Sequence, residues 1–534
     1  MRKSLFKRIL LTLLFALIWY YFVLPPFNLH AFSFYLYVIF VFMFFIIISI
    51  PDTVINLFST VKHLKEVKVE NKVIKYMFFC VIGIIQLIII VNFVLSPIFN
   101  SKAYYNRIKI NENGDFTKDV KEVDFSKIPL LDKDSSQKLG DRTMGEMTSL
   151  VSQFYVSNLY TQINYKDEIT RVTPLEYSGF IKYLANRSNG IPAYITVNSV
   201  TGKSELKKLE KGMRYAPSAH FFENLHRKLR LSYPTKIFDT ENFEIDNEGN
   251  PYWIVPTIKY VGIGLRKDVD GVIIFNPVNG ESNWYKVEDV PSWVDHVYNA
   301  DLILEQVNDW GAYKNGFLNT IFSEREVVAT TEGYNYTILG DDVYLYTGIT
   351  SVSTDESNIG FILTNMRTKE TNFYEISGAE EFSAMASAEG QVQQMKYTAS
   401  FPLLINFNGK PTYLLSLKDD AGLVKMYAFV DVKDYQKVVV TDSSKGIETA
   451  AANYLGDEKV IDEDKVVTNV ITIKNIKSVV IDGNTYYYIV DENDNKFKVS
   501  IKVNKDILPF LNSGDSIKAT YEEKSVSEIV KLEK

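Results

Sequence analysis

Hydrophobic and polar positions divide the chain into two parts with different patterns. Before residue 100, three apolar stretches at about 9–25, 31–50 and 76–98 contain almost no charged side chains. The last two reach the ~20 residues that a helix needs to cross ~30 Å of hydrocarbon, and the first is at the short end of the spanning range. Backbone groups find no water in a bilayer core, so spanning segments of this kind must be helical. The pattern predicts a domain of three transmembrane helices over residues 1–99.

Beyond residue 146 the pattern changes to short runs rich in β-branched and aromatic residues, separated by turn residues. Three runs resemble one another, because each reaches an asparagine and turns about four residues later. They are 194–203, 272–281 and 361–370, with asparagines Asn198, Asn276 and Asn365, spaced 78 and 89 residues apart. Asparagine and glycine tolerate positive φ, so such runs reverse the chain between paired strands. The spacing predicts repeated β-hairpin and helix modules in an α+β region over 146–457.

The segment between these two parts has no clear periodicity. Residues 100–145 mix short apolar stretches with dense charge and are predicted to form a linker or stalk. Around Gly145–Leu159 the apolar spacing matches one face of a helix. We therefore expect a helix there, close to the membrane.

The first of the repeated runs carries a family resemblance. Its sequence Val197-Asn198-Ser199-Val200-Thr201-Gly202-Lys203 contains V-N-x-x-T-G-K and resembles the PepSY module, an extracytoplasmic unit of membrane-anchored bacterial proteins. The resemblance covers about ten residues per copy, and Lys369 stands where the other two runs have a turn glycine. The family is associated with holding peptidases inactive or with sensing the envelope. The resemblance therefore implies binding rather than chemistry.

The C-terminal residues 466–534 form a module of their own. Strands are predicted near 468–479, 485–490 and 496–502, then a short helix at 505–511, then strands at 516–521 and 526–532. Three strands, a helix and two strands is the order of an OB-like β-barrel. Ten lysines balance ten acidic residues in this module, so it lacks the positive groove that nucleic acid requires.

Charge orients the chain in the membrane. Residues 1–99 carry nine lysines and arginines against three acidic residues, whereas residues 100–534 carry 49 against 62, a formal charge of −13. The basic residues flank the first span and fill the second connection; they are Arg2, Lys3, Lys7, Arg8, Lys62, Lys65, Lys68, Lys72 and Lys75. Basic segments stay in the cytoplasm. We expect a multi-pass plasma-membrane protein with a cytoplasmic N-terminus, an extracytoplasmic C-terminal part and no nucleic-acid partner.

The residues that usually carry catalysis or bind metal are sparse. The only cysteine, Cys80, lies in the third span, so the outer part can form no disulfide, which fits a bacterial surface. His220, Glu223 and His226 are the one metal-like grouping, but the histidines are about 120° apart on a helix, unlike an i,i+4 pair. The acidic turns 246–250 and 268–271 have their glycine too early for an EF-hand loop. We predict no metal, no cofactor and no catalytic residue.

Aromatic residues supply the candidate ligand-binding residues. They are Tyr252, Trp253, Trp284, Tyr285 and Trp293. Such rings could line a groove for a peptide or glycan, because they supply contact area at low entropic cost. Aromatic residues at alternating strand positions belong to the core more often, so both interpretations stay open.

Three functions fit these patterns. The first is a non-enzymatic, membrane-anchored protein of the bacterial cell envelope that binds or regulates an envelope protein, peptide or glycan. The second is an envelope hydrolase or transferase that uses only Asp and Glu, which leave no local signature. The third is a subunit of a larger membrane complex, because three spans exceed what anchoring needs.

Overall fold

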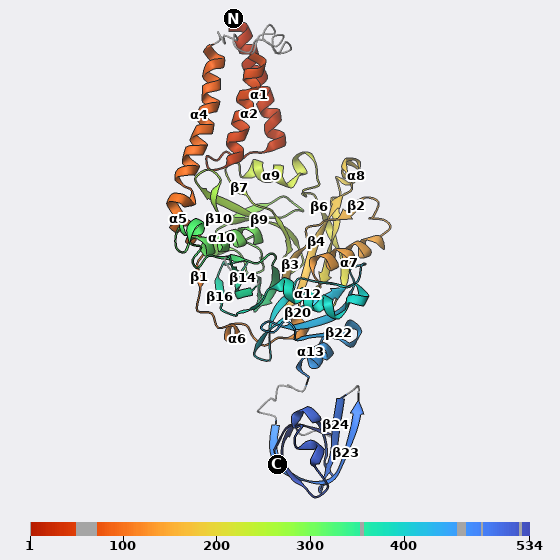
Figure 1. Ribbon diagram of the computed structural model, residues 1–534. Coiled ribbons are helices and arrows are strands. Elements are labelled where there is room, and N and C mark those ends of the chain that lie inside the picture. The colour runs from red at the N-terminus through yellow and green to blue at the C-terminus, as the bar shows by residue number, and fades with distance from the viewer. Residues whose placement is uncertain are drawn as a thin grey trace.

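Three apolar helices begin the chain, as the hydrophobic pattern predicts (Figure 1). They are α1 (Arg2–Val23), α2 (Phe32–Ser49) and α4 (Lys72–Val94). Windows of 18 to 20 residues in these helices have mean hydropathies of 1.7, 2.5 and 2.7, so each is long and apolar enough to cross a membrane. The third helix ends before the predicted residue 98, because Pro97 opens a separate helix, α5 (Pro97–Tyr105).

The computed structural model describes residues 2–49, 72–352, 357–456, 466–481, 484–522 and 526–533. Within these ranges the chain is a mixed α+β protein with four β-sheets and a closed barrel in addition to the apolar helices. Three of the lysines that support the predicted orientation, Lys62, Lys65 and Lys68, lie outside the described residues. We call the four sheets and their helices, residues 97–456, the body.

The four sheets share one connectivity. In each, two short strands pair with a first long strand, this strand pairs with a second long strand, and the second long strand pairs with a closing strand, all antiparallel. The first sheet contains β2 (Phe154–Val156), β3 (Thr161–Tyr165), β4 (Glu168–Tyr177), β5 (Ile191–Asn198) and β6 (Ser204–Met213). The second contains β7 (Ile237–Phe238), β8 (Asn242–Ile245), β9 (Pro251–Val261), β10 (Leu265–Phe275) and β11 (Ser282–Tyr285).

The other two sheets follow the same plan. The third contains β12 (Val328–Thr330), β13 (Asn335–Leu339), β14 (Asp342–Ser351), β15 (Ser357–Asn365) and β16 (Thr371–Tyr374), with β17 (Gly378–Ala379) and β1 (Ile110–Asn111) added at its edges. The fourth contains β18 (Thr398–Ala399), β19 (Leu403–Phe407), β20 (Lys410–Lys418), β21 (Val424–Asp431) and β22 (Val438–Asp442).

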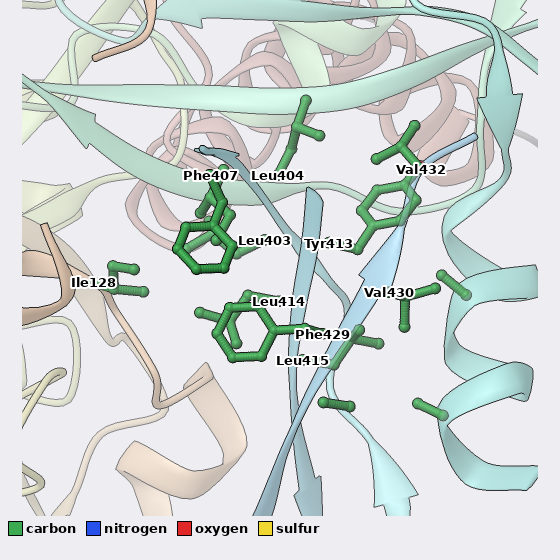
Figure 2. Packing of buried hydrophobic residues seen from close by; sticks show 14 of the residues in the cluster. Ile128, Leu403, Leu404, Phe407, Tyr413, Leu414, Leu415, Phe429, Val430 and Val432 are labelled. Carbon is green, nitrogen blue, oxygen red and sulfur yellow. The ribbon is translucent and has the colours of Figure 1, made fainter. Parts of the chain in front are cut away.

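Hydrophobic cores join consecutive sheets, because adjacent residues of a buried strand point to opposite faces. The first core lies between sheets one and two, around Phe243, Trp253 and Phe275. The second lies between sheets two and three and includes α10 (Ala300–Tyr313). The third joins sheets three and four to α12 (Glu381–Gln391) and α13 (Ile447–Leu455), as the side chains around Phe429 in Figure 2 illustrate. Each inner sheet thus contributes side chains to two cores.

Residues 100–145 are packed against the sheets of the body and do not form the stalk that their charge predicted. Phe116, Val120, Ile128 and Leu130 are buried in the third core. The strand β1 pairs in parallel with β16, and the backbone N–H of Val123 donates to the carbonyl of Asn406 at 2.9 Å. Apolar residues scattered among the charged ones supply this packing, and the high density of charge makes them hard to recognise in the sequence. We call residues 106–132 the lead segment.

The helix predicted over Gly145–Leu159 is wrong in position. The observed helix, α7 (Lys133–Gly145), ends where the predicted one was to begin, and residues 154–156 form β2. Asp132 caps α7, because its carboxylate accepts the backbone N–H of Ser135 at 2.9 Å. In β2, Phe154 and Val156 are buried while Tyr155 is exposed, which is the alternation of a strand.

The C-terminal module is a closed barrel whose strands lie close to their predicted positions. Its order is β23 (Val466–Ile481), β24 (Asn484–Asp491), β25 (Lys496–Ser500), β27 (Ser527–Glu533) and β26 (Ser516–Glu522). The predicted helix at 505–511 is only a short 3₁₀ turn, η7 (Leu508–Phe510), within which Pro509 has no backbone N–H to donate. The buried residues around Phe497 form a core of the barrel's own.

Candidate functional site

The five aromatic candidates do not form one groove. Trp253 is 1% exposed and belongs to the first core, where its indole N–H donates to the carbonyl of Tyr215 at 3.1 Å. Trp284 packs against the same core and donates to the hydroxyl of Thr257 at 2.9 Å. Both side chains are therefore used in packing and hydrogen bonds on one face of the second sheet.

The remaining three candidates lie on the opposite face of that sheet. Tyr252, Tyr285 and Trp293 pack against the second core, and the rings of Tyr252 and Trp293 are 5.1 Å apart. Tyr252 neighbours Trp253 on β9, and Tyr285 neighbours Trp284 on β11, so each pair is divided between the two faces. The structure thus brings together Tyr252 and Trp293 but separates them from Trp253 and Trp284.

The histidine and acidic motifs serve other purposes in the described residues. Glu223 is ion-paired with Arg187 at 3.0 Å and Arg214 at 2.8 Å, and it accepts the hydroxyl of Tyr183 at 2.8 Å. Asp246 closes its own turn by accepting the backbone N–H groups of Glu248 and Asn250. No group of three or more metal-ligating side chains occurs in the described ranges.

A pocket of ≈ 330 Å³ lies where the lead segment meets three of the four sheets. We call it the junction pocket. Its walls come from the lead segment, the β3–β4 hairpin, the β13–β14 hairpin and β19. The lining residues are 119–124, 127–129, Asn164, Asp167, Ile169, 337–340 and 403–406. Segments almost 290 residues apart therefore build one site.

Hydrogen bonds hold the walls of the junction pocket in place. The carboxylate of Glu122 accepts the backbone N–H groups of Asn408 at 2.5 Å and Gly409 at 3.3 Å. The side chain of Asn406 donates to the carbonyl of Val120 at 2.7 Å. These bonds fix the lead segment against the β19–β20 hairpin, so the pocket is preformed.

The pocket has an apolar floor and a charged rim. Val120, Ile128, Leu403, Leu404 and Ile405 are buried. Four exposed carboxylates and two exposed lysines stand around them, namely Asp119, Glu122, Asp124, Asp167, Lys121 and Lys127. Hydrogen bonds from Ser126 lower the pKa of Asp124, so that carboxylate stays ionised. The rim carries a formal charge of −2 and favours a cationic or neutral ligand.

A buried polar cluster lies behind the pocket wall. Its hydrogen bonds join the first two sheets, and the ring of His296 lies 5.3 Å from that of Tyr336 in the third sheet. The carboxylate of Glu244 accepts the backbone N–H groups of Asp295 at 2.9 Å and His296 at 3.0 Å. Asp295 accepts the backbone N–H of Asn164, a pocket residue, at 2.8 Å. A ring nitrogen of His296 lies 2.7 Å from the carbonyl of Gln162.

Burial shifts the acid–base behaviour of this cluster. It raises the pKa of Glu244 to about 7 and lowers the pKa of His296 to about 4. Burial, and then the charge of Glu244, also raises the pKa of Asp295. These side chains are 0 to 4% exposed and bond to backbone groups. Their role is therefore to hold the sheets together rather than to meet a substrate.

The pocket contains few groups capable of chemistry. Among its lining residues, all of them described, Thr337 is the only hydroxyl, and histidine and cysteine do not occur. The other ionisable groups of the pocket are the carboxylates and lysines of its exposed rim. The arrangement suits binding, with apolar contacts on the floor and ionic contacts at the rim.

Sequence reasoning missed the junction pocket for a physical reason. The dense charge of residues 115–124 predicts a linker or stalk, and no neighbouring residue in the sequence indicates that they pack against β19. One signal was present, since four of the five residues of Leu403–Phe407 are apolar, which is typical of a strand buried on both faces. A scan of protein-family models and searches of curated proteins and solved structures found no match for the chain.

Proposed function

We propose that this chain is a non-enzymatic binding protein of the bacterial cell envelope, anchored by three membrane spans, whose body lies outside the plasma membrane. Its junction pocket binds a segment of an envelope protein or peptide that presents an apolar side chain next to a basic one. The observation that carries the proposal is the preformed pocket with an apolar floor and a −2 rim.

The orientation rests on where the basic residues gather. In Figure 1, the N-terminus of α1 and the start of α4 lie at the end of the helices away from the body. Lys7, Arg8, Lys72 and Lys75 belong to these ends. Basic residues are retained on the cytoplasmic side, which puts the body on the outer side.

The shared turn geometry of the four sheets supports a PepSY-like interpretation. At the end of each second long strand, a side-chain oxygen accepts the backbone N–H groups two and three residues further on. The four residues are Asn198, Asn276, Asn365 and Asp431. The turn glycines Gly202 and Gly280 have φ of 74° and 80°, and Lys369 takes the same place with φ of 66°. We infer four copies of one module rather than the three visible in the sequence.

The barrel supports an OB-like interpretation by its strand order and by the 3₁₀ turn between its third and fourth strands. Its balanced charge gives no groove for nucleic acid. We assign it a binding or spacing role beside the body, with a protein, peptide or glycan as its partner.

Photo-crosslinking in living cells tests the proposed function. A photoreactive amino acid replaces Lys127 at the pocket rim, and Lys286, exposed elsewhere on the body, serves as the matched control site. We expect adducts with an envelope protein or peptide from position 127 and not from position 286. Adding Asp167→Lys should weaken them, because the rim then loses most of its negative charge. Identical adducts from both positions would contradict the proposal.

A further inference from the structure

The helix α8 (Phe180–Asn186) lies on the side of the body that faces the transmembrane helices (Figure 1), and it contributes to a group of exposed apolar side chains. This group comprises Phe180, Ile181 and Leu184 of α8 and Phe221 and Phe222 of the 3₁₀ turn η2 (Phe221–Glu223). Ile181 is 70% exposed and Phe222 is 63% exposed. We call these five residues the α8–η2 patch. Contiguous exposed apolar groups of this kind mark interaction sites.

The patch is held in place from its inner side. Tyr183, on the inward face of α8, is fully buried and donates to the carboxylate of Glu223 at 2.8 Å. The rings of Phe180 and Phe221 are 6.0 Å apart. Phe221 has a φ of 54°, in the left-handed region that a bulky residue adopts only under constraint. The apolar side chains are therefore presented outward by a fixed backbone.

Contacts with α1 put the patch at the depth of the membrane interface. The ring of Phe222 is 6.5 Å from the ring of Tyr21, in the last turn of α1. Beside it, α9 (Leu225–Ser232) places the guanidinium of Arg227 4.0 Å from the same ring, and Arg230 donates to the carbonyl of Leu24 at 2.9 Å. Tyrosine and tryptophan at the end of a span sit at the level of the lipid headgroups. The patch lies beside that level.

Positive charge borders the apolar side chains. Lys182 lies on α8, Arg187 is the residue that follows α8, and Arg214 follows the last strand of the first sheet, β6. Arg187 and Arg214 are each about half exposed, although both are paired with the buried carboxylate of Glu223. Apolar residues with basic neighbours are typical of elements that rest in the membrane interface on anionic lipid.

We propose that the α8–η2 patch inserts into the interface of the membrane that the three helices cross, with anionic phospholipid as its ligand. The spans then anchor the chain, while the patch fixes the tilt of the body on the lipid surface. This contact involves lipid and not the junction pocket, so its test can fail while the proposed function holds, and the reverse.

Fluorescence quenching in nanodiscs tests this inference on the full chain. Cys80→Ala removes the native thiol, and Ile181→Cys carries an environment-sensitive label in discs of anionic lipid brominated on the acyl chains. We expect roughly a twofold loss of emission relative to unbrominated lipid, because an interfacial element buries its apolar face ~5–10 Å into the headgroup and acyl boundary. Ile89→Cys, exposed on α4, is the positive control, and Phe382→Cys on α12 is the negative control.

The outcomes separate lipid from other partners. Quenching at positions 181 and 89 but not at 382 supports the proposal. No quenching at 181 with full quenching at 89 overturns it and leaves the patch to a protein partner. Replacing anionic by zwitterionic brominated lipid should weaken quenching at 181 only, and an unchanged signal would overturn the choice of anionic lipid.

Discussion

The body and the barrel differ in how their hydrophobic cores are built. In the body, each of three cores is shared by two sheets, and the lead segment adds bonds between positions almost 290 residues apart. In the barrel, the buried core residues all lie between Ile471 and Leu532, on strands that pair only with one another or at the 3₁₀ turn between them. The body's stability is therefore collective, whereas the barrel's is local. Four predictions test this difference, from the largest effect to the smallest.

A matched pair of core truncations should separate the two regions. Phe243→Ala removes a fully buried ring of the first core, and Phe497→Ala removes a ring of the barrel core that is 1% exposed. Each should cost its own region about 3–5 kcal/mol, from lost transfer energy and the cavity left behind. All five tryptophans, Trp19, Trp253, Trp284, Trp293 and Trp310, lie outside the barrel. Four of them lie in the body and Trp19 lies in α1, so with Trp19→Phe as the background tryptophan fluorescence during urea unfolding reports the body, and hydrogen exchange over 466–533 reports the barrel.

An effect of the barrel substitution on the stability of the body would contradict this difference. If Phe497→Ala lowered the urea midpoint of tryptophan fluorescence as much as Phe243→Ala does, the barrel and the body would unfold as one unit. Equal exchange rates over 466–533 in the wild type and in Phe243→Ala are expected.

Loss of the buried carboxylate should weaken the body next most strongly. Glu244→Ala leaves the backbone N–H groups of Asp295 and His296 buried without an acceptor. An unsatisfied buried donor costs about 1–3 kcal/mol, so we expect about 3 kcal/mol for the two by urea unfolding. Glu248→Ala, an exposed carboxylate in the next turn, is the control and should change stability by less than about 0.5 kcal/mol. Equal effects of the two substitutions would show that the buried cluster around Glu244 does not stabilise the body.

The same cluster should make the body, but not the barrel, sensitive to pH. Burial raises the pKa of Glu244 to about 7, so its contribution to stability is complete below about pH 4.5 and is lost as pH rises through 7. The pKa of His296, lowered to about 4, acts in the opposite direction between pH 4 and 6.5. Above pH 6.5 the loss from Glu244 remains, and Asp295, whose pKa burial and the charge of Glu244 also raise, acts in the same direction. We expect the body to lose about 1 kcal/mol between pH 6.5 and 8, measured by urea unfolding.

Replacing the titrating group checks the source of this dependence. Glu244→Gln cannot ionise, so the loss between pH 6.5 and 8 should shrink in that variant even though its stability is lower throughout. A wild-type body whose stability rises over this interval would contradict the assignment.

The smallest effect concerns the turn that the four sheets share. Asn276→Ala removes the acceptor of the backbone N–H groups of Val278 and Asn279 and should cost the body about 1 kcal/mol. Asn276→Asp keeps the acceptor, as Asp431 does in the fourth sheet, and should cost less than about 0.5 kcal/mol. Equal losses in urea unfolding would show that the turns are not equivalent.

Local patterns predicted much of the fold but little of the site. Apolar runs located the three helices, and strand alternation located the barrel strands to within a few residues, because both depend on neighbouring positions. The separation of Tyr252 from Trp253 was also available in the sequence, since adjacent strand residues face opposite sides. The junction pocket could not be predicted, because Glu122 and Asn408 are 286 residues apart and meet only when the lead segment has packed against the fourth sheet.

The central claim is that the body lies outside the membrane, and cysteine labelling of intact cells tests it most directly. In a Cys80→Ala background, Lys433→Cys places an exposed thiol on the body and Lys7→Cys places one at the basic end of α1. A membrane-impermeant maleimide should label position 433 in intact cells and position 7 only after permeabilisation. Labelling of position 7 in intact cells, with position 433 protected until the cells are opened, would contradict the account.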